Sequence, residues 1–192
     1  MLTLLMLLFM QTPQPEYHVV VFAYESKLGG LKPAQTHVFA SWTKSIDKKV
    51  VENIDINWGP KDDVGRVTNQ IVEGDVKSIK VSIEVFKDKK YKIWTLKTNE
   101  QFFEDAKKQQ QKLKNAKYKA LDKKTRPEAI NCIHACSDVC GYLETGLKSG
   151  ISAGQSIVDF FLLNGKVSTE KDSWVLQSLL EKCDVKLPED DK

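Results

Sequence analysis

The chain has 192 residues and a mass of 21.8 kDa, enough for one domain with a substantial hydrophobic core. Hydrophobic residues make up 41% and charged residues 29%, a composition that excludes disordered and fibrous proteins. The 29 Lys and Arg residues against 26 Asp and Glu give a net charge of +3, so any basic surface must be local. Four cysteines are too few for a small domain built on disulfides.

The first ten residues, MLTLLMLLFM, are almost wholly apolar and uncharged. About 20 residues are needed to cross a bilayer, so this stretch fits the apolar region of a secretory signal peptide better than a transmembrane helix. It lacks a basic start and a small-residue cleavage site, and a core strand or a retained anchor is the alternative. We expect residues 1–15 to be a signal peptide or N-terminal hydrophobic segment and residues 16–192 to form one domain. The protein would then be secreted or periplasmic, with no transmembrane span after removal of the signal.

Strand patterns occupy the first half of the chain. Five segments are rich in β-branched and aromatic residues: Tyr17–Glu25, Thr36–Thr43, Val50–Trp58, Ser78–Phe86 and Tyr91–Leu96. In the third of these, apolar and polar residues alternate, as they do in a strand with one buried face. The last two predict a hairpin that turns around Asp88–Lys90.

Helix patterns follow in the second half. Asn99 is a suitable N-cap for a helix that runs to about Asn115, with its Lys- and Gln-rich residues on the solvated face. Further helices are predicted near Asn131, over Ile151–Gly165 and over Ser173–Cys183. Strands followed by helices predict an α+β fold, in which an antiparallel sheet of about five strands is packed by helices from the C-terminal half.

The segment Asn131–Asp138, NCIHACSD, is the most informative for chemistry. Asn131 can cap a helix and place Cys132 in its first turn, where unpaired N–H groups and the helix dipole favour a thiolate. A nucleophilic cysteine also needs a base, and His37 could face this helix from a strand, oriented by a polar residue on the adjacent strand. The residues available for that orienting role are Asn53, Asp55 and Asn57. A buried structural cysteine and a hydrogen-bonded core histidine explain the same pattern without catalysis.

A strand histidine far upstream of an Asn-Cys dipeptide that opens a helix resembles the circularly permuted papain-like fold. That group includes lecithin:retinol acyltransferase-like acyltransferases and bacterial cell-wall amidases and peptidases. The resemblance extends loosely over Thr36–Leu143. Three segments are also similar to uncharacterised exported bacterial proteins: Thr36–Trp42, Ile56–Pro60 and Asn131–Asp138.

The resemblance implies a papain-like domain over residues 16–192, with Cys132 as the nucleophile and His37 as the general base. Asp55 is the candidate for the third polar residue of the family. The implied function is a thiol hydrolase or acyltransferase that acts on an amide or ester of an acyl, peptide or cell-wall substrate. We expect it to need no cofactor.

The cysteines also allow other interpretations. Cys132, Cys136 and Cys140 recur every four residues and would span about 12 Å of helix, too far for one ion to bind all three, so we expect no metal site. Cys136 and Cys140 fit the buried face of the helix. In an exported protein, Cys183 can form a disulfide with either of them, and a disulfide at Cys132 would remove the nucleophile.

A basic segment suggests a second class of function. Residues Val76–Arg126 hold 16 Lys and Arg against 6 Asp and Glu, interrupted by aromatic residues. This lysine-rich face is either simply solvated or binds an anionic surface such as lipid head groups or cell-wall polymer. No signature of specific nucleic-acid binding accompanies it. The alternative to the thiol enzyme is therefore a non-catalytic exported binding domain for an anionic partner. Gly146, Gly150 and Gly154 lack the context of a phosphate loop and fit loop and cap positions.

Overall fold

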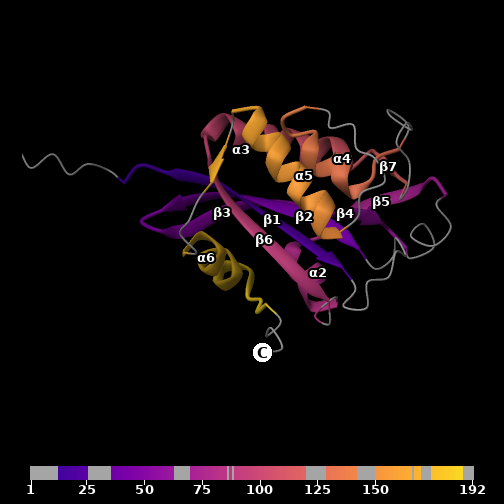
Figure 1. Ribbon diagram of the computed structural model, residues 1–192, viewed down its shortest axis with the longest axis horizontal. Coiled ribbons are helices and arrows are strands. Elements are labelled where there is room, and N and C mark those ends of the chain that lie inside the picture. The colour runs from indigo at the N-terminus through magenta and orange to yellow at the C-terminus, as the bar shows by residue number, and fades with distance from the viewer. Residues whose placement is uncertain are drawn as a thin grey trace, which may run out of the picture.

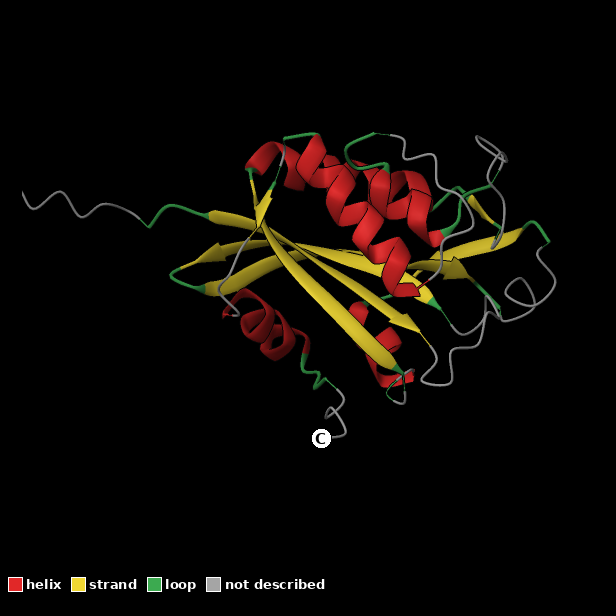
Figure 2. Ribbon diagram, viewed as in Figure 1, coloured by secondary structure: helices red, strands yellow, loops and turns green. Residues whose placement is uncertain are grey.

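The computed structural model describes residues 13–25, 36–62, 70–85, 87, 89–119, 129–141, 150–165, 167–169 and 174–187. Its architecture is α+β, with an antiparallel main sheet, a small second sheet and helices concentrated in the C-terminal half (Figure 2). The predicted fold class is therefore confirmed. Residues 1–12 of the expected signal or hydrophobic segment at residues 1–15 lie outside the described residues.

The main sheet is built around a central strand that is buried on both faces. Its strands are β1 (Glu16–Glu25), β2 (His37–Ile46), β3 (Lys49–Ile56), β6 (Lys90–Thr98) and the two-residue β8 (Ser168–Thr169), in the order β3-β2-β1-β6-β8. All neighbouring pairs are antiparallel. Val19, Val20, Val21 and Phe22 of β1 are completely buried, so both faces of the sheet must be covered. The second sheet holds β4 (Trp58–Pro60), β5 (Val72–Val76) and β7 (Lys117–Tyr118).

Two layers of helices cover the main sheet (Figure 1). On one side lie α3 (Glu100–Leu113), α4 (Cys132–Ser137) and α5 (Gly150–Leu163); on the other lie α2 (Ile79–Val85) and α6 (Trp174–Cys183). Alternate residues of β2 serve the two layers, because successive side chains of a strand point to opposite faces. Val38 and Ala40 pack under α3, α4 and α5, which defines the α3–α5 face. Phe39 packs with the apolar residues of α2 and α6, which defines the α2–α6 face.

Helix α3 begins where the sequence predicts. The side-chain oxygen of Asn99 accepts a hydrogen bond from Phe102 N at 2.9 Å, and Asn99 has the extended backbone of an N-cap, with φ −129°. One part of the prediction is wrong, because the Lys- and Gln-rich run is not wholly solvated. Gln109 is buried and donates a hydrogen bond to Ala135 O at 3.2 Å, which ties α3 to α4.

The predicted strand over residues 78–86 is wrong, since Ile79–Val85 forms the helix α2. Apolar residues at 79, 81, 83 and 85 fit the period of a strand, yet Ile79 and Ile83 also lie one helical turn apart. The structure buries only these two against the sheet and leaves Val81 and Val85 41% and 63% exposed. A helix therefore takes the place of the first strand of the expected hairpin, and the second strand, β6, pairs with β1 instead.

Gly154 lies within α5 and not at a cap, which corrects the interpretation from the sequence. A Cβ atom at this position would lie 2.6 Å from Trp94 Cζ3 and 2.7 Å from Ala23 Cβ. Because only a hydrogen occupies that space, α5 approaches β1 and β6 more closely than a helix with a side chain here could. The expected helices over residues 151–165 and 173–183 are otherwise present as α5 and α6.

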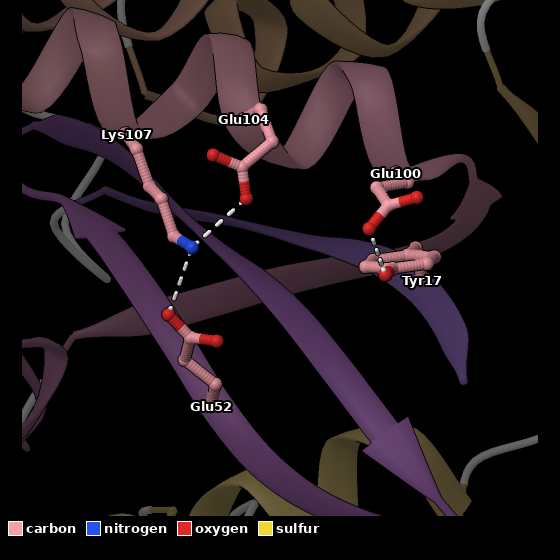
Figure 3. Close-up of polar contacts among 5 residues, drawn as sticks. All are labelled: Tyr17, Glu52, Glu100, Glu104 and Lys107. Carbon is pink, nitrogen blue, oxygen red and sulfur yellow. Dashed lines mark hydrogen bonds and ion pairs between the residues drawn. The ribbon is translucent and has the colours of Figure 1, made fainter.

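A polar network joins the start of α3 to the sheet (Figure 3). Tyr17 Oη of β1 donates to Glu100 Oε1 at 3.0 Å, and Lys107 Nζ lies 3.1 Å from Glu52 Oε1 of β3 and 2.9 Å from Glu104 Oε1. Burial raises the pKa of Tyr17, and the hydrogen bond to Glu100 raises it further. These contacts fix α3 over the α3–α5 face at the end of the sheet where β1 begins.

Candidate functional site

His37 is the first residue of β2 and is only 8% exposed. Its ring centroid lies 5.6 Å from that of Phe39 and 5.8 Å from that of Tyr24, both of which belong to the core of the α2–α6 face. Its Nε2 lies 2.9 Å from Asn57 Oδ1. His37 therefore points toward α2, where the side chain of Asn57 holds its ring.

The surroundings of Asn57 determine which nitrogen of His37 carries the proton. Asn57 Nδ2 donates to the backbone oxygen of Ser78 at 2.8 Å, and a carbonyl oxygen can only accept, so the amide orientation is fixed. Asn57 Oδ1 then faces His37 and accepts from its Nε2–H. The Ser82 hydroxyl, 2.9 Å from Asn57 Nδ2 and 3.1 Å from Oδ1, completes a buried His–Asn–Ser network between β2, the residue after β3, and α2.

Asp55, the candidate third polar residue, does not contribute to this network. Its Oδ1 accepts from Ser41 Oγ at 2.7 Å and from Asn53 Nδ2 at 2.8 Å, and its Oδ2 accepts from Ile79 N at 3.1 Å. The carboxylate thus binds the first backbone N–H of α2 and positions that helix. Of the three orienting residues that the sequence offered, the structure places Asn57 beside His37.

Cys132 is the first residue of α4 and is half-buried. The predicted N-cap is confirmed, because Asn131 Oδ1 accepts from His134 N at 2.8 Å. The helix lies against the sheet as expected, and the thiol of Cys136, one turn further, approaches Ile56 O at 3.5 Å. Cys132 packs against the core of the α3–α5 face.

Cys132 and His37 therefore contact opposite faces of the main sheet, and the structure does not bring the predicted pair together. Val38 faces the layer that contains α4, whereas His37, one position earlier, faces α2 with Phe39. His37 could reach the side of α4 only if β2 shifted by one residue, and that shift would turn every core side chain of β2 toward the wrong layer of helices. His134, two residues after Cys132, is buried in α4.

All four cysteines lie among the described residues, and each is a thiol. The disulfides considered from Cys183 to Cys136 or Cys140 are not present, because Cys183 packs on the α2–α6 face and the other two on the α3–α5 face. Burial raises the pKa of the Cys136 thiol well above its usual range and raises that of Cys183 as well. Neither of these two thiols is poised as a thiolate.

A pocket that the sequence did not predict lies between α2 and α6. It has a volume of about 1100 Å³ and is lined by residues of α2, of α6 and of the segments that follow each helix. Five of the lining side chains are apolar: Ile83, Leu176, Leu180, Val185 and Leu187. The signal for it in the sequence is the apolar pair Val185 and Leu187 after the end of α6. This pair indicates a pocket only if residues 79–85 form a helix that faces it, and the strand predicted over residues 78–86 does not provide that wall.

The basic segment does not form one continuous face. Its described lysines lie on α3, above one face of the sheet, on α2 and the following turn, near the other face, and on the strands β6 and β7 (Figure 1). Several are paired, including Lys108 with Asp105 and Lys117 with Glu73. Within the described ranges, no group of three or more His, Cys, Asp or Glu residues is arranged to hold a metal ion. No helix among those residues is both long enough and apolar enough to cross a membrane.

Comparison with known proteins identifies no relative: no protein-family model, no curated protein and no solved structure matches this chain.

Proposed function

We propose that this chain is a non-catalytic, exported binding domain that attaches to an anionic lipid surface, in preference to a thiol hydrolase or acyltransferase. The observation that supports this proposal most is the combination of exposed apolar and cationic side chains at one end of the sheet. We call this end of the sheet the α2 end and define it by Val81, Val85 and Lys87 on the α2–α6 face and by Lys90 and Lys92 on the α3–α5 face, where Lys92 Nζ lies 5.1 Å from the ring centroid of Trp94.

The α2 end has both components that interfacial binding requires. Val81 and Val85 lie one turn apart on the outer side of α2 and are exposed enough to enter the head-group region. The turn after α2 and the start of β6 then present exposed lysines. Each lysine near an anionic surface contributes about 1 kcal/mol, so two or three of them suffice for measurable attachment.

Lys90 and Lys92 also have a structural role. Among the described residues, β8 pairs with β6 only at Leu96 and Lys97, which leaves the first half of β6 as an open edge. Lysines on an open edge discourage pairing with strands of other molecules. That role does not account for Val81 and Val85, which belong to a helix and not to the edge.

Vesicle sedimentation tests the proposal. The protein should bind vesicles that contain phosphatidylglycerol and phosphatidylcholine, and bind those of phosphatidylcholine alone weakly. Replacing Lys87 and Lys90 together by Gln should weaken binding about 30-fold, since about 1 kcal/mol is lost for each lysine. The matched control is Lys48→Gln with Lys49→Gln, two exposed lysines at the opposite end of the sheet, which should leave binding unchanged. An equal loss in both pairs, or no binding to anionic vesicles, would refute the proposal.

The competing thiol chemistry has its own test. The rate of Cys132 alkylation by iodoacetamide is followed against pH by peptide mapping, in the wild type and in His37→Gln. With the two residues on opposite faces of the sheet, both proteins should give the same pH profile. A profile that shifts to higher pH in His37→Gln would establish an ion pair and restore the enzyme as the better assignment.

A further inference from the structure

We propose that the open edge of β6 binds an extended acidic segment of a partner protein, which adds to the main sheet as a further strand. The segment would carry an acidic residue opposite Lys92 and β-branched residues at the neighbouring positions. This inference goes beyond the proposed function and rests on a different observation, the unpaired backbone of β6, although Lys90 and Lys92 belong to the α2 end as well.

β6 is the outermost long strand of the main sheet, and only part of its outer side is paired (Figure 1). Within the described ranges, β8 pairs with it at Leu96 and Lys97. The stretch from Lys90 to Thr95 pairs with β1 alone and is about 20 Å long, at about 3.3 Å per residue. Strands are usually about 5–6 residues long, so a complete further strand fits along this stretch.

β3, the outer strand on the other side of the sheet, has its backbone bound by side chains from both helix layers. Ser178 Oγ of α6 accepts from Val50 N at 2.8 Å, and Gln110 Nε2 of α3 donates to Asp55 O at 2.8 Å. In the part of the chain that the structure describes, no helix side chain binds the backbone of residues 92–95 in this way. The backbone groups on the outer side of β6 are therefore available to a partner strand.

The charges along the open edge favour an acidic segment. Lys92 is exposed, and the residue opposite it on β1 is Ala23, so no carboxylate of β1 lies directly across from it. Its nitrogen lies 5.1 Å from the ring centroid of Trp94, on the same face of the sheet. Lys90, also exposed, lies two positions earlier on that face, opposite Glu25 of β1. An acidic residue on the added strand would give Lys92 the cross-strand partner that β1 does not offer.

The other face of the same edge is apolar. Tyr91 and Ile93 are half-buried and pack against the core of the α2–α6 face, so β-branched residues opposite them would extend that core. The expected segment therefore alternates acidic and β-branched residues. A basic strand, such as β6 of a second copy, would bring more positive charge to the edge. The lysines that prevent self-association thus also select an acidic partner.

Fluorescence anisotropy with labelled peptides tests the proposal. The probe is a seven-residue peptide of alternating valine and glutamate, which should bind the purified protein. The same peptide with two N-methylated valines keeps every charge and lacks two backbone N–H donors, so it should bind at least about tenfold more weakly. Equal binding of the N-methylated peptide would show that charge alone attracts the probe and would overturn strand addition, as would no binding of the probe.

A charge exchange locates the site. Lys92→Glu should weaken binding of the glutamate peptide at least about fivefold and strengthen binding of a valine–lysine peptide by a similar factor. The matched control is Lys112→Glu, an exposed lysine on α3, which should bind both peptides like the wild type. Loss of the glutamate peptide in both variants, or in neither, would refute the site.

The outcomes for the two proposals are distinguishable. A protein that sediments with anionic vesicles but binds no glutamate peptide refutes only strand addition. One that prefers the glutamate peptide to its N-methylated form but binds no vesicles refutes only surface attachment, because N-methylation alters backbone pairing and not charge.

Discussion

Replacement of Gly154 by Ala tests the close approach of α5 to the main sheet. The new Cβ would lie 2.6 Å from Trp94 Cζ3 and 2.7 Å from Ala23 Cβ, both inside 3.0 Å, so α5 must move away from β1 and β6 or Trp94 must shift. Overpacking in a core costs about 1–3 kcal/mol, and two simultaneous contacts place this site near the upper value. Ala also gains about 1 kcal/mol of helix propensity over Gly. We expect the free energy of unfolding to fall by about 2 kcal/mol.

Guanidinium unfolding followed by circular dichroism measures this change. Ser152→Ala, at an exposed position of the same helix, is the matched control and should change the free energy by less than about 0.5 kcal/mol. Trp94→Phe should relieve part of the penalty, so the double variant should be more stable than the sum of the single changes predicts. A Gly154→Ala protein as stable as the wild type would show that α5 does not lie this close to the sheet.

Three further outcomes follow from the contacts described. Asn57→Ala should lower the free energy of unfolding by about 3 kcal/mol in urea titrations, because buried His37, buried Ser82 and the backbone oxygen of Ser78 each lose a hydrogen bond. Folding raises the pKa of Tyr17, so its protonated side chain contributes fully to the free energy of unfolding below about pH 10, and this contribution is lost at higher pH. In denaturant titrations above that pH, the free energy of unfolding of Tyr17→Phe should therefore fall less steeply with pH than that of the wild type. Cys136, buried and with a raised pKa, should be alkylated far more slowly than half-buried Cys132 in the native protein, which mass spectrometry can measure.

Local interactions explain which parts of the structure the sequence could predict. Asn99 and Asn131 were identified as N-caps because the cap bonds a backbone N–H three residues ahead, an arrangement fully contained in the local sequence. The strands β1, β2 and β3 were recognised from β-branched residues and alternation for the same reason. The order of strands before helices was then enough for the fold class.

Non-local interactions explain what the sequence could not predict. The alternation over residues 78–86 fits a strand and a helix equally, and only the sheet face available to Ile79 and Ile83 selects the helix. The choice between Asp55 and Asn57 as the partner of His37 depends on how α2 lies across them. Whether His37 and Cys132 meet depends on which layer α4 joins, and nothing within β2 or α4 specifies that. The predicted pairing of His37 with Cys132 is wrong for this reason, because it requires two elements far apart in the sequence to contact the same face of the sheet.

The strand order has a consequence for how the chain folds. β1, β2 and β3 form a meander that neighbouring residues can assemble early, but β1 must also pair with β6, which is synthesised after the whole of the second sheet's β4 and β5 and after α2. Closing so long a loop costs entropy that the short β1–β2 connection does not, so β6 should join the sheet after the meander has formed. Until then, the most apolar strand of the protein presents an unpaired edge to solvent. During that interval the folding chain is most prone to aggregation. The lysines of β6, which discourage pairing with other molecules, lie at the edge of the sheet only after β6 has paired with β1.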